Sequence, residues 1–363
     1  MSSVGFQGED ITTTAGAAYC ETEVCFMSAD GTSLYGVLRT PTRGSTPIPA
    51  VLLLPGGAPV DRNGNPSATL SLSHVRGVQL NVLRELAEAL SDAGIASFRY
   101  DKRGVGASGG DFLRRTAIEL IDDAEAALEL LRTVPSIGKV VAFGHSEGGL
   151  IAPQLCARGH EVAGVVFAAS TGLGLMSVAK HQFAGAAARA VAQGLSPTDA
   201  WEDFALLQQQ VADGTDLVAY GKDGLESGEW FRSWADLDVP GTLLKVQCPA
   251  LVIHGDRDYQ VPWTESLRIV QQLRQAGNAD VTLNLFSNVD HLLKFEPEWS
   301  APERYQQVDR PMEPLVARSL VAWTRRVVGL GDRPALGDPW QGFSTGFEDG
   351  TWQVRDAAMP VRT

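Results

Sequence analysis

A serine in a glycine-rich turn is the residue of this chain best suited to nucleophilic chemistry. Residues 144–149 read Gly-His-Ser-Glu-Gly-Gly, a G-x-S-x-G pattern centred on Ser146. A β-rich run at 139–143 precedes the pattern and an apolar run at 150–155 follows it, so the serine lies at a strand–turn–helix junction. The backbone N–H of Glu147 would then start a helix and point at a developing oxyanion. Small-residue turns are common, so the motif needs partners.

The partners of a nucleophilic serine are a base that takes its proton and an acid that orients the base. Downstream, the apolar strand 250–254 leads into a loop that contains Asp256 and Asp258. The alternating strand 281–286 is followed shortly by His291. The chain order of serine, acid and histidine, with the acid and the histidine just past predicted strands, is typical of an α/β hydrolase.

Five motifs follow one another in a highly specific order. They are Leu54-Pro-Gly-Gly-Ala-Pro-Val-Asp-Arg-Asn-Gly-Asn65, Arg99-Tyr-Asp-Lys-Arg-Gly-Val-Gly-Ala-Ser108, the turn around Ser146, His254-Gly-Asp-Arg-Asp258 with Val261-Pro262, and Asp290-His291. Together they resemble the serine hydrolases of the α/β-hydrolase superfamily, and most closely the capped bacterial esterases related to dienelactone hydrolases and acyl-aminoacyl peptidases. The resemblance spans most of residues 20–328.

The resemblance implies a catalytic triad of Ser146, Asp258 and His291. In the family pattern His-Gly-x-x-Asp-x-x-Val-Pro the acid stands at the fifth position, which Asp258 occupies here. Asp256 is the competing carboxylate, and we expect it to shape the loop through an Asx-type hydrogen bond.

A second oxyanion donor is expected in the loop after the third strand of the family fold. This loop normally begins His-Gly, whereas here it reads Pro55-Gly56-Gly57. The resemblance therefore implies that the backbone N–H groups of Gly57 and Glu147 hold the oxyanion. The Glu147 carboxylate, expected beside the nucleophile, should disfavour anionic substrates.

Composition and charge exclude several classes of protein. The chain has 363 residues, of which 44% are hydrophobic and 20% charged, an ordinary globular composition with room for a large core. Its net charge of −13 argues against nucleic acid and anionic membranes as partners. The sequence contains no run of about 18 apolar residues, and the N-terminus lacks the basic and apolar regions of a signal peptide. We therefore expect a cytoplasmic protein.

Cysteines and histidines show no pattern typical of metal binding. The four cysteines, Cys20, Cys25, Cys156 and Cys248, contain no C-x-x-C pair, and the six histidines form no ligand set. We expect free, mostly buried thiols in a reducing compartment. Neither a metal nor an organic cofactor is predicted.

Strands and helices alternate along most of the chain. Residues 21–29 and 32–40 predict a β-hairpin around the turn Asp30-Gly31. Such alternation predicts an α/β-hydrolase fold with a mostly parallel central sheet and helices on both faces. The other predicted strands are 48–54, 95–100, 139–143, 162–169, 250–254 and 281–286, and the predicted helices are 78–93, 116–131, 264–275 and 314–328.

One insertion of roughly 80 residues without a convincing strand interrupts this alternation. We predict a helical cap over 171–246, between the two parts of the hydrolase core at 19–170 and 247–330. An N-terminal extension over 1–18 and a C-terminal tail over 331–363 complete the chain. Most cap aromatics should pack the cap onto the core, and the others should line a largely apolar pocket.

These features predict a serine hydrolase that cleaves a carboxylic ester or lactone through an acyl-enzyme. The expected partner is a small molecule that is bulky, largely apolar and neutral. A thioesterase and a carbon–carbon bond hydrolase are alternatives on the same triad. A non-catalytic binding protein is the alternative from another class, since fold does not fix function. The aromatic-bearing tail leaves a homodimer open.

Overall fold

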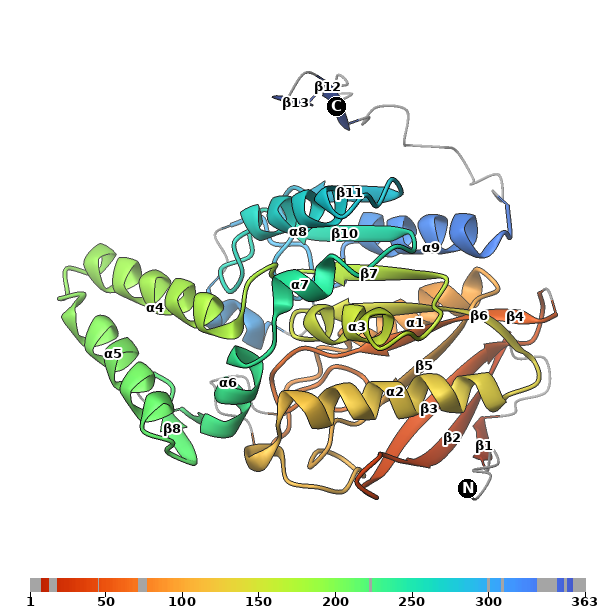
Figure 1. Ribbon diagram of the computed structural model, residues 1–363, viewed down its shortest axis with the longest axis horizontal. Helices are drawn as coiled ribbons and strands as arrows, with labels where there is room; N and C mark the ends of the chain where they lie inside the picture. Colours follow the sequence, from red (N-terminus) through yellow and green to blue (C-terminus); the bar gives the residue numbers. More distant parts are fainter. Residues whose placement is uncertain are drawn as a thin grey trace.

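One mixed sheet forms the centre of the molecule. The computed structural model describes residues 8–12, 18–44, 46–70, 77–221, 224–298, 301–307, 310–331, 345–348 and 351–354. The strand order is β1-β2-β3-β5-β4-β6-β7-β10-β11 (Figure 1). Neighbouring strands run parallel from β5 to β11, whereas β1, β2, β3 and β5 pair antiparallel. The bounds are β1 Gly8–Thr12, β2 Tyr19–Met27, β3 Ser33–Pro41, β4 Ile48–Leu54, β5 Ala96–Tyr100, β6 Ile137–His145, β7 Gly164–Ala168, β10 Ala250–Gly255 and β11 Val281–Phe286.

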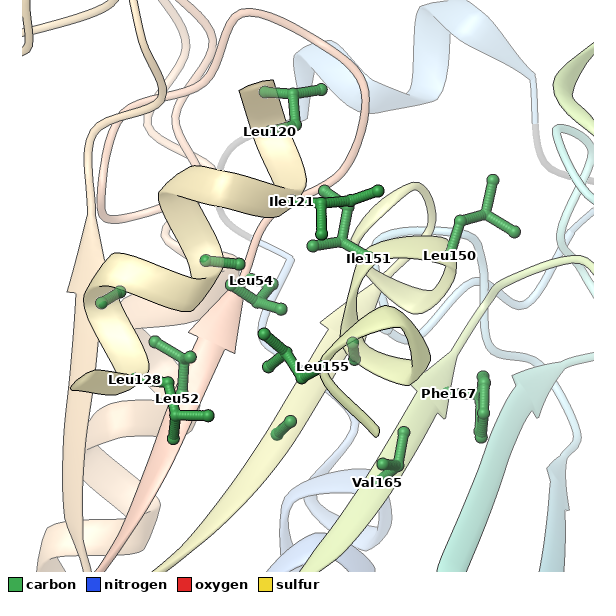
Figure 2. Packing of buried hydrophobic residues seen from close by; sticks show 14 of the residues in the cluster. Leu52, Leu54, Leu120, Ile121, Leu128, Leu150, Ile151, Leu155, Val165 and Phe167 are labelled. Carbon is green, nitrogen blue, oxygen red and sulfur yellow. The ribbon is translucent and has the colours of Figure 1, made fainter. Parts of the chain in front are cut away.

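Helices cover both faces of this sheet, which confirms the predicted fold class. The side chains of β4 alternate between the two faces: Leu52 and Leu54 join one buried cluster, whereas Val51 and Leu53 join the other. A strand buried on both faces reads as a continuous apolar run, which is why β4 shows no polar alternation in the sequence. Figure 2 shows the first cluster, where side chains of α2 and α3 pack onto β4 and β7.

The helices around the core fall close to their predicted ranges. Side chains of α2 (Ala117–Thr133), α3 (Gly148–Ala157) and α8 (Thr264–Gln275) belong to the first cluster. Those of α1 (Val82–Asp92) and α9 (Pro314–Val328) belong to the second. The predicted helix 78–93 begins later, at Val82, because Asn81 adopts a left-handed conformation with φ of 53°. Two short 3₁₀ helices, η1 (Phe112–Arg114) and η2 (Pro302–Gln306), lie in connecting loops.

The inserted segment between β7 and β10 is mostly helical. It contains α4 (Leu175–Ala192), α5 (Thr198–Ala212), α6 (Gly228–Ala235) and α7 (Val239–Leu243), drawn in green in Figure 1. The expectation of no strand in this segment is wrong. Strands β8 (Leu217–Ala219) and β9 (Leu225–Ser227) form a small antiparallel pair. Each has three residues, too few to produce a readable two-residue alternation.

Both ends of the chain add strands that the sequence analysis did not predict. Residues 1–18 were expected to lie outside the core, but β1 pairs antiparallel with β2 and becomes an edge strand of the main sheet. In the predicted tail, β12 (Thr345–Glu348) and β13 (Thr351–Val354) pair with each other. Most of the predicted tail lies outside the described residues.

Candidate active site

The sharp turn between β6 and α3 places Ser146 in a left-handed backbone conformation, with φ of 53°. Two glycines make this turn sterically feasible. A Cβ on Gly144 would lie 2.0 Å from the Gly148 carbonyl oxygen, and one on Gly148 would lie 2.4 Å from that of Leu54. The Ser146 N–H donates to the Ala168 carbonyl over 2.8 Å, which ties the turn to β7. The G-x-S-x-G motif therefore forms the strained strand–turn–helix junction that the sequence predicts.

Asp258 and His291 are joined directly, although 33 residues separate them. Asp258 follows β10 and His291 follows β11, and Nδ1 of His291 lies 2.8 Å from Oδ2 of Asp258. The other carboxylate oxygen accepts the N–H groups of Gln260 and Val261 over 2.8 and 2.9 Å. The carboxylate is thus fixed by the loop that carries it, and it selects the His291 tautomer with a proton on Nδ1. The opposite nitrogen, Nε2, is left to act as a base.

His254 also contacts Asp258, a contact that the sequence analysis did not identify. Its Nε2 lies 3.1 Å from both Asp258 Oδ2 and the Val261 carbonyl oxygen. Both neighbours are acceptors, so this nitrogen carries a proton. Burial alone would raise the pKa of Asp258, but the nearby His291 charge and the hydrogen bonds from His254 and His291 lower it below the usual range. Asp258 therefore stays ionised at neutral pH.

Asp256 has a different role in the same loop. Its Oδ1 accepts the backbone N–H of Asn288 over 2.7 Å and does not reach His291. The side chain of Asp256 is 41% exposed, whereas that of Asp258 is fully buried. The structure therefore brings Asp258 to His291 and leaves Asp256 as a link between the loops after β10 and β11.

His145 connects the serine turn to the histidine loop. Its ring centroid lies 5.0 Å from that of His291, and its Nε2 lies 2.7 Å from the His291 carbonyl oxygen. Burial, together with the charge of His291, lowers the pKa of His145 to about 4, so it is neutral and donates this bond. The Ser146 hydroxyl and the His291 ring form no hydrogen bond with each other in this structure. Such contacts are often loose before substrate binds.

The loop after β4 packs against the serine turn. A Cβ built on Gly56 would lie 3.2 Å from Cβ of Ser146, and one on Gly57 would lie 3.8 Å from Cβ of Glu147. Within the described part of the chain, no acceptor receives a hydrogen bond from the backbone N–H of Gly57 or Glu147. The two predicted oxyanion donors therefore lie on adjoining loops beside the serine, and their N–H groups are available to a ligand.

The Glu147 side chain corrects one expectation from the sequence. Its carboxylate was expected to disfavour anionic substrates from its place beside the nucleophile, but Glu147 is only 2% exposed and its oxygens accept hydrogen bonds from inside the protein. Oε2 lies 2.7 Å from Nζ of Lys102, and Oε1 accepts the indole N–H groups of Trp230 and Trp234, the latter over 3.0 Å. Burial raises the pKa of Glu147, but Lys102 and Arg115 outweigh it and lower the pKa. The charge is neutralised locally, so it supplies no reason to reject anions.

Aromatic side chains of the inserted segment make contacts both within the segment and with the core. The ring centroids of Phe183 and Phe204 lie 5.5 Å apart, and the indole N–H of Trp234 donates to Glu147. Trp230 lies beside the loop after β4, because a Cβ on Gly57 would lie 3.4 Å from its Cζ2. The partly buried Leu175 and Met176 begin α4, shortly after β7 ends.

Cysteines and metal-binding groups add little to this site. Within the described residues, no cluster of three or more histidine, cysteine, aspartate or glutamate side chains could hold a metal ion. None of the cysteines forms a disulfide. The expectation of mostly buried thiols is wrong, since Cys25 is exposed and Cys20, Cys156 and Cys248 are partly exposed. No helix in the described ranges is long and apolar enough to span a bilayer.

Comparison with known proteins gives one family. The model of the family described as serine aminopeptidase, S33, matches residues 64–298, more than half of the chain. Esterase EstD of Thermotoga maritima is 26% identical over 282 residues, which cover 77% of this chain. Those residues cover 63% of EstD, so the chain spans less than two thirds of the length of this relative.

Solved structures share the fold at low sequence identity. Est1E of Butyrivibrio proteoclasticus, with ferulic acid bound, superposes with a TM-score of 0.56 at 16% identity, covering 84% of this chain and 99% of that one. The Pyrococcus furiosus esterase Pf2001 gives 0.53 at 16% identity, covering 90% and 98%. The strand–turn–helix junction at Ser146, the sheet order and the family match agree: the chain belongs to the serine aminopeptidase S33 family of α/β hydrolases.

Proposed function

We propose that this protein is a serine hydrolase that cleaves a carboxylic ester or a lactone through an acyl-enzyme. The observation that carries the proposal is the set of three groups that follow the parallel strands β6, β10 and β11 of one sheet. Ser146 occupies the strained turn after β6, and Asp258 fixes the His291 tautomer through a contact of 2.8 Å. The esterase EstD, at 26% identity, supports the same reaction type.

The proposed reaction follows from these positions. Nε2 of His291 takes the Ser146 proton while Oγ attacks the substrate carbonyl, and Asp258 stabilises the imidazolium that forms. The N–H groups of Gly57 and Glu147 hold the negative charge on the carbonyl oxygen. His291 then protonates the leaving alcohol, and afterwards activates the water that releases the acid. For a lactone the leaving alcohol stays attached to the acyl group.

A bulky, largely apolar substrate is the proposed class. Trp230 packs against Gly57, and the partly buried Leu175 and Met176 begin α4, the first helix after β7. We expect these apolar side chains to line the acyl site, because apolar side chains dominate ligand pockets. We do not retain neutrality as a requirement, because the Glu147 charge on which it rested is paired with Lys102.

An aminopeptidase, the activity in the family's description, is less well supported by the carboxylates near the site. Such an enzyme needs an anion to bind the free amine of its substrate. Glu147 is already paired with Lys102. Glu265 accepts hydrogen bonds from Thr171 and from the Gly172 N–H over 2.8 and 3.2 Å. Neither carboxylate is free to receive an ammonium group, so ester cleavage is the better proposal.

A panel of p-nitrophenyl esters of increasing acyl length tests this proposal, with simple lactones and methyl ferulate added. Wild-type protein should turn over part of the panel, and the chain-length optimum should report the size of the acyl site. Turnover by Ser146→Ala should be at least about 10⁴-fold slower than by wild-type protein, because the nucleophile is absent.

A fluorophosphonate that labels active serines provides a readout independent of the substrate. Wild-type protein should be labelled once, at Ser146, and Ser146→Ala should not be labelled. Ester turnover that persists in Ser146→Ala would refute the mechanism. Labelling without turnover of any ester or lactone would refute the esterase proposal and direct the search to thioesters and carbon–carbon bonds.

A further inference from the structure

Lys102 is a buried cation that contacts both segments carrying the proposed oxyanion donors. Its side chain is 3% exposed, and Nζ lies 2.8 Å from the Gly56 carbonyl oxygen and 2.7 Å from Oε2 of Glu147. Gly56 belongs to the loop after β4, and Glu147 follows the nucleophile. A single ammonium group therefore joins the two segments that carry the proposed donors.

The contact with Gly56 fixes the direction of the next N–H. The only cis peptide bond in the described ranges is Thr46–Pro47, so the Gly56–Gly57 bond is trans. In a trans peptide the carbonyl and the following N–H point in opposite directions. Because Lys102 holds the Gly56 carbonyl toward the interior, the Gly57 N–H must point the other way, out of the cluster. The next carbonyl, of Gly57, is held by Arg115 Nη2 over 3.2 Å.

Residues of the inserted segment also contact Arg115 and Glu147. Arg115 pairs with Glu226 of β9 over 2.8 Å, and its guanidinium lies 4.5 Å from the ring centroid of Trp230. The indole N–H groups of Trp230 and Trp234 reach Glu147 Oε1. Side chains that are far apart in the sequence thus meet at the Glu147 carboxylate, and together they fix its position.

We propose that Lys102 is a positioning residue for the oxyanion hole: it orients the Gly56–Gly57 peptide and anchors Glu147, so that both N–H donors point at the same oxygen. This inference rests on the proposed function. A purely structural role accounts for it less well, because a buried ion pair is weak evidence for stability and apolar residues of similar volume often replace one without loss. Here the ammonium also holds a backbone carbonyl, which an apolar side chain cannot do.

The test compares Lys102→Met with the double variant Lys102→Met/Glu147→Gln. The single variant leaves a buried carboxylate unpaired and should be unstable. The double variant removes both charges and keeps an acceptor for the two indole groups, so its unfolding midpoint should recover. Its kcat should nevertheless stay about ten- to a hundredfold below wild type, less than the loss of about 10²–10³ for removing a donor outright because the N–H is misdirected and not removed, with KM changed by less than about threefold.

Arg39→Met is the matched control, because Arg39 is a buried cation on β3 that pairs with Glu21 over 3.1 Å on the side of the sheet near β2. It should lose stability while its kcat stays near wild type. The acid limb of the kcat/KM profile should be unchanged in the double variant, because Asp258 and His291 keep their contact. A double variant with wild-type kcat would overturn the proposal.

A crystal structure of the double variant gives a result that does not depend on the substrate. The Gly56–Gly57 peptide should be rotated or in two orientations, whereas an unchanged peptide would overturn the proposal. Failure of the proposed function looks different: wild-type protein would then turn over no ester or lactone, while the peptide orientation would still report on Lys102.

Discussion

Replacing Asp258 by asparagine should abolish most of the activity while leaving the site nearly unchanged in shape. Asp258 Oδ1 accepts two backbone N–H groups, so the asparagine carbonyl oxygen should take the Oδ1 position and accept the same two hydrogen bonds. Its amide NH₂ would then face Nδ1 of His291 and Nε2 of His254, both of which donate to the carboxylate in the native protein. His291 can satisfy the NH₂ only by moving its proton to Nε2, and it then cannot accept a proton from Ser146.

The expected loss follows from this tautomer change. Asparagine at the acid position of a serine triad lowers kcat by about 10⁴, or about 5 kcal/mol of transition-state stabilisation. Since the pKa of Asp258 is held below its usual range, the carboxylate is ionised at neutral pH, where the assay is run. The assay is kcat/KM on the best p-nitrophenyl ester, with fluorophosphonate labelling as the second measure.

Asp256→Asn is the matched control for this prediction. The asparagine carbonyl can still accept the Asn288 N–H, so the substitution removes only the negative charge from this hydrogen bond, on a side chain that is 41% exposed. The expected cost is about 1 kcal/mol of stability, and kcat/KM should fall by less than about tenfold. If Asp256→Asn loses activity by orders of magnitude and Asp258→Asn stays close to wild type, the assignment of the acid is wrong.

Two further predictions concern stability. Burial lowers the pKa of His145 to about 4, so between about pH 6.5 and 4 the unfolded chain binds a proton that the folded protein does not, and stability falls by about 3 kcal/mol as the pH drops. Urea unfolding at pH 7 and pH 4.5 should show this loss reduced in His145→Gln, and an equal loss in both proteins would contradict it. Gly144→Ala should destabilise by about 2 kcal/mol or more, since its Cβ would lie 2.0 Å from a backbone oxygen. The control Gly174→Ala, with nothing within 4 Å of its Cβ and φ of −74°, should cost less than about 1 kcal/mol in thermal melts.

Local sequence signals were enough to predict most strands of the sheet, the serine turn and the acid and histidine that follow two strands. Continuous apolar runs such as Ile48–Leu54 indicate strands buried on both faces. The pairing of Asp258 with His291 was predicted from the family pattern, whereas the order of the strands and the edge strand β1 were not predicted. By contrast, the three-residue strands of the inserted segment carry too little pattern to be recognised.

The sequence analysis did not predict the long-range polar contacts around the site. The pairing of Lys102 with Glu147 joins residues 45 positions apart, and Trp230 meets the same carboxylate from 83 positions further along the chain. No periodicity or turn signal relates such residues. The unpredicted strand β9 supplies Glu226, which pairs with Arg115 beside the loop that carries Gly57. Missing the short strand therefore also meant missing a support of the proposed oxyanion hole.

Glu147 shows why the residue after a nucleophile must be judged by its backbone and side chain separately. Its N–H lies at the start of α3 and is available to a ligand, which sequence position alone predicts. Its side chain ends among Lys102, Trp230 and Trp234. In the proposed mechanism the N–H of this residue faces the oxyanion, while its negative charge is neutralised inside the protein. A free carboxylate at the same place would oppose the oxyanion, so the proposed use of the Glu147 N–H depends on the burial and pairing of its side chain.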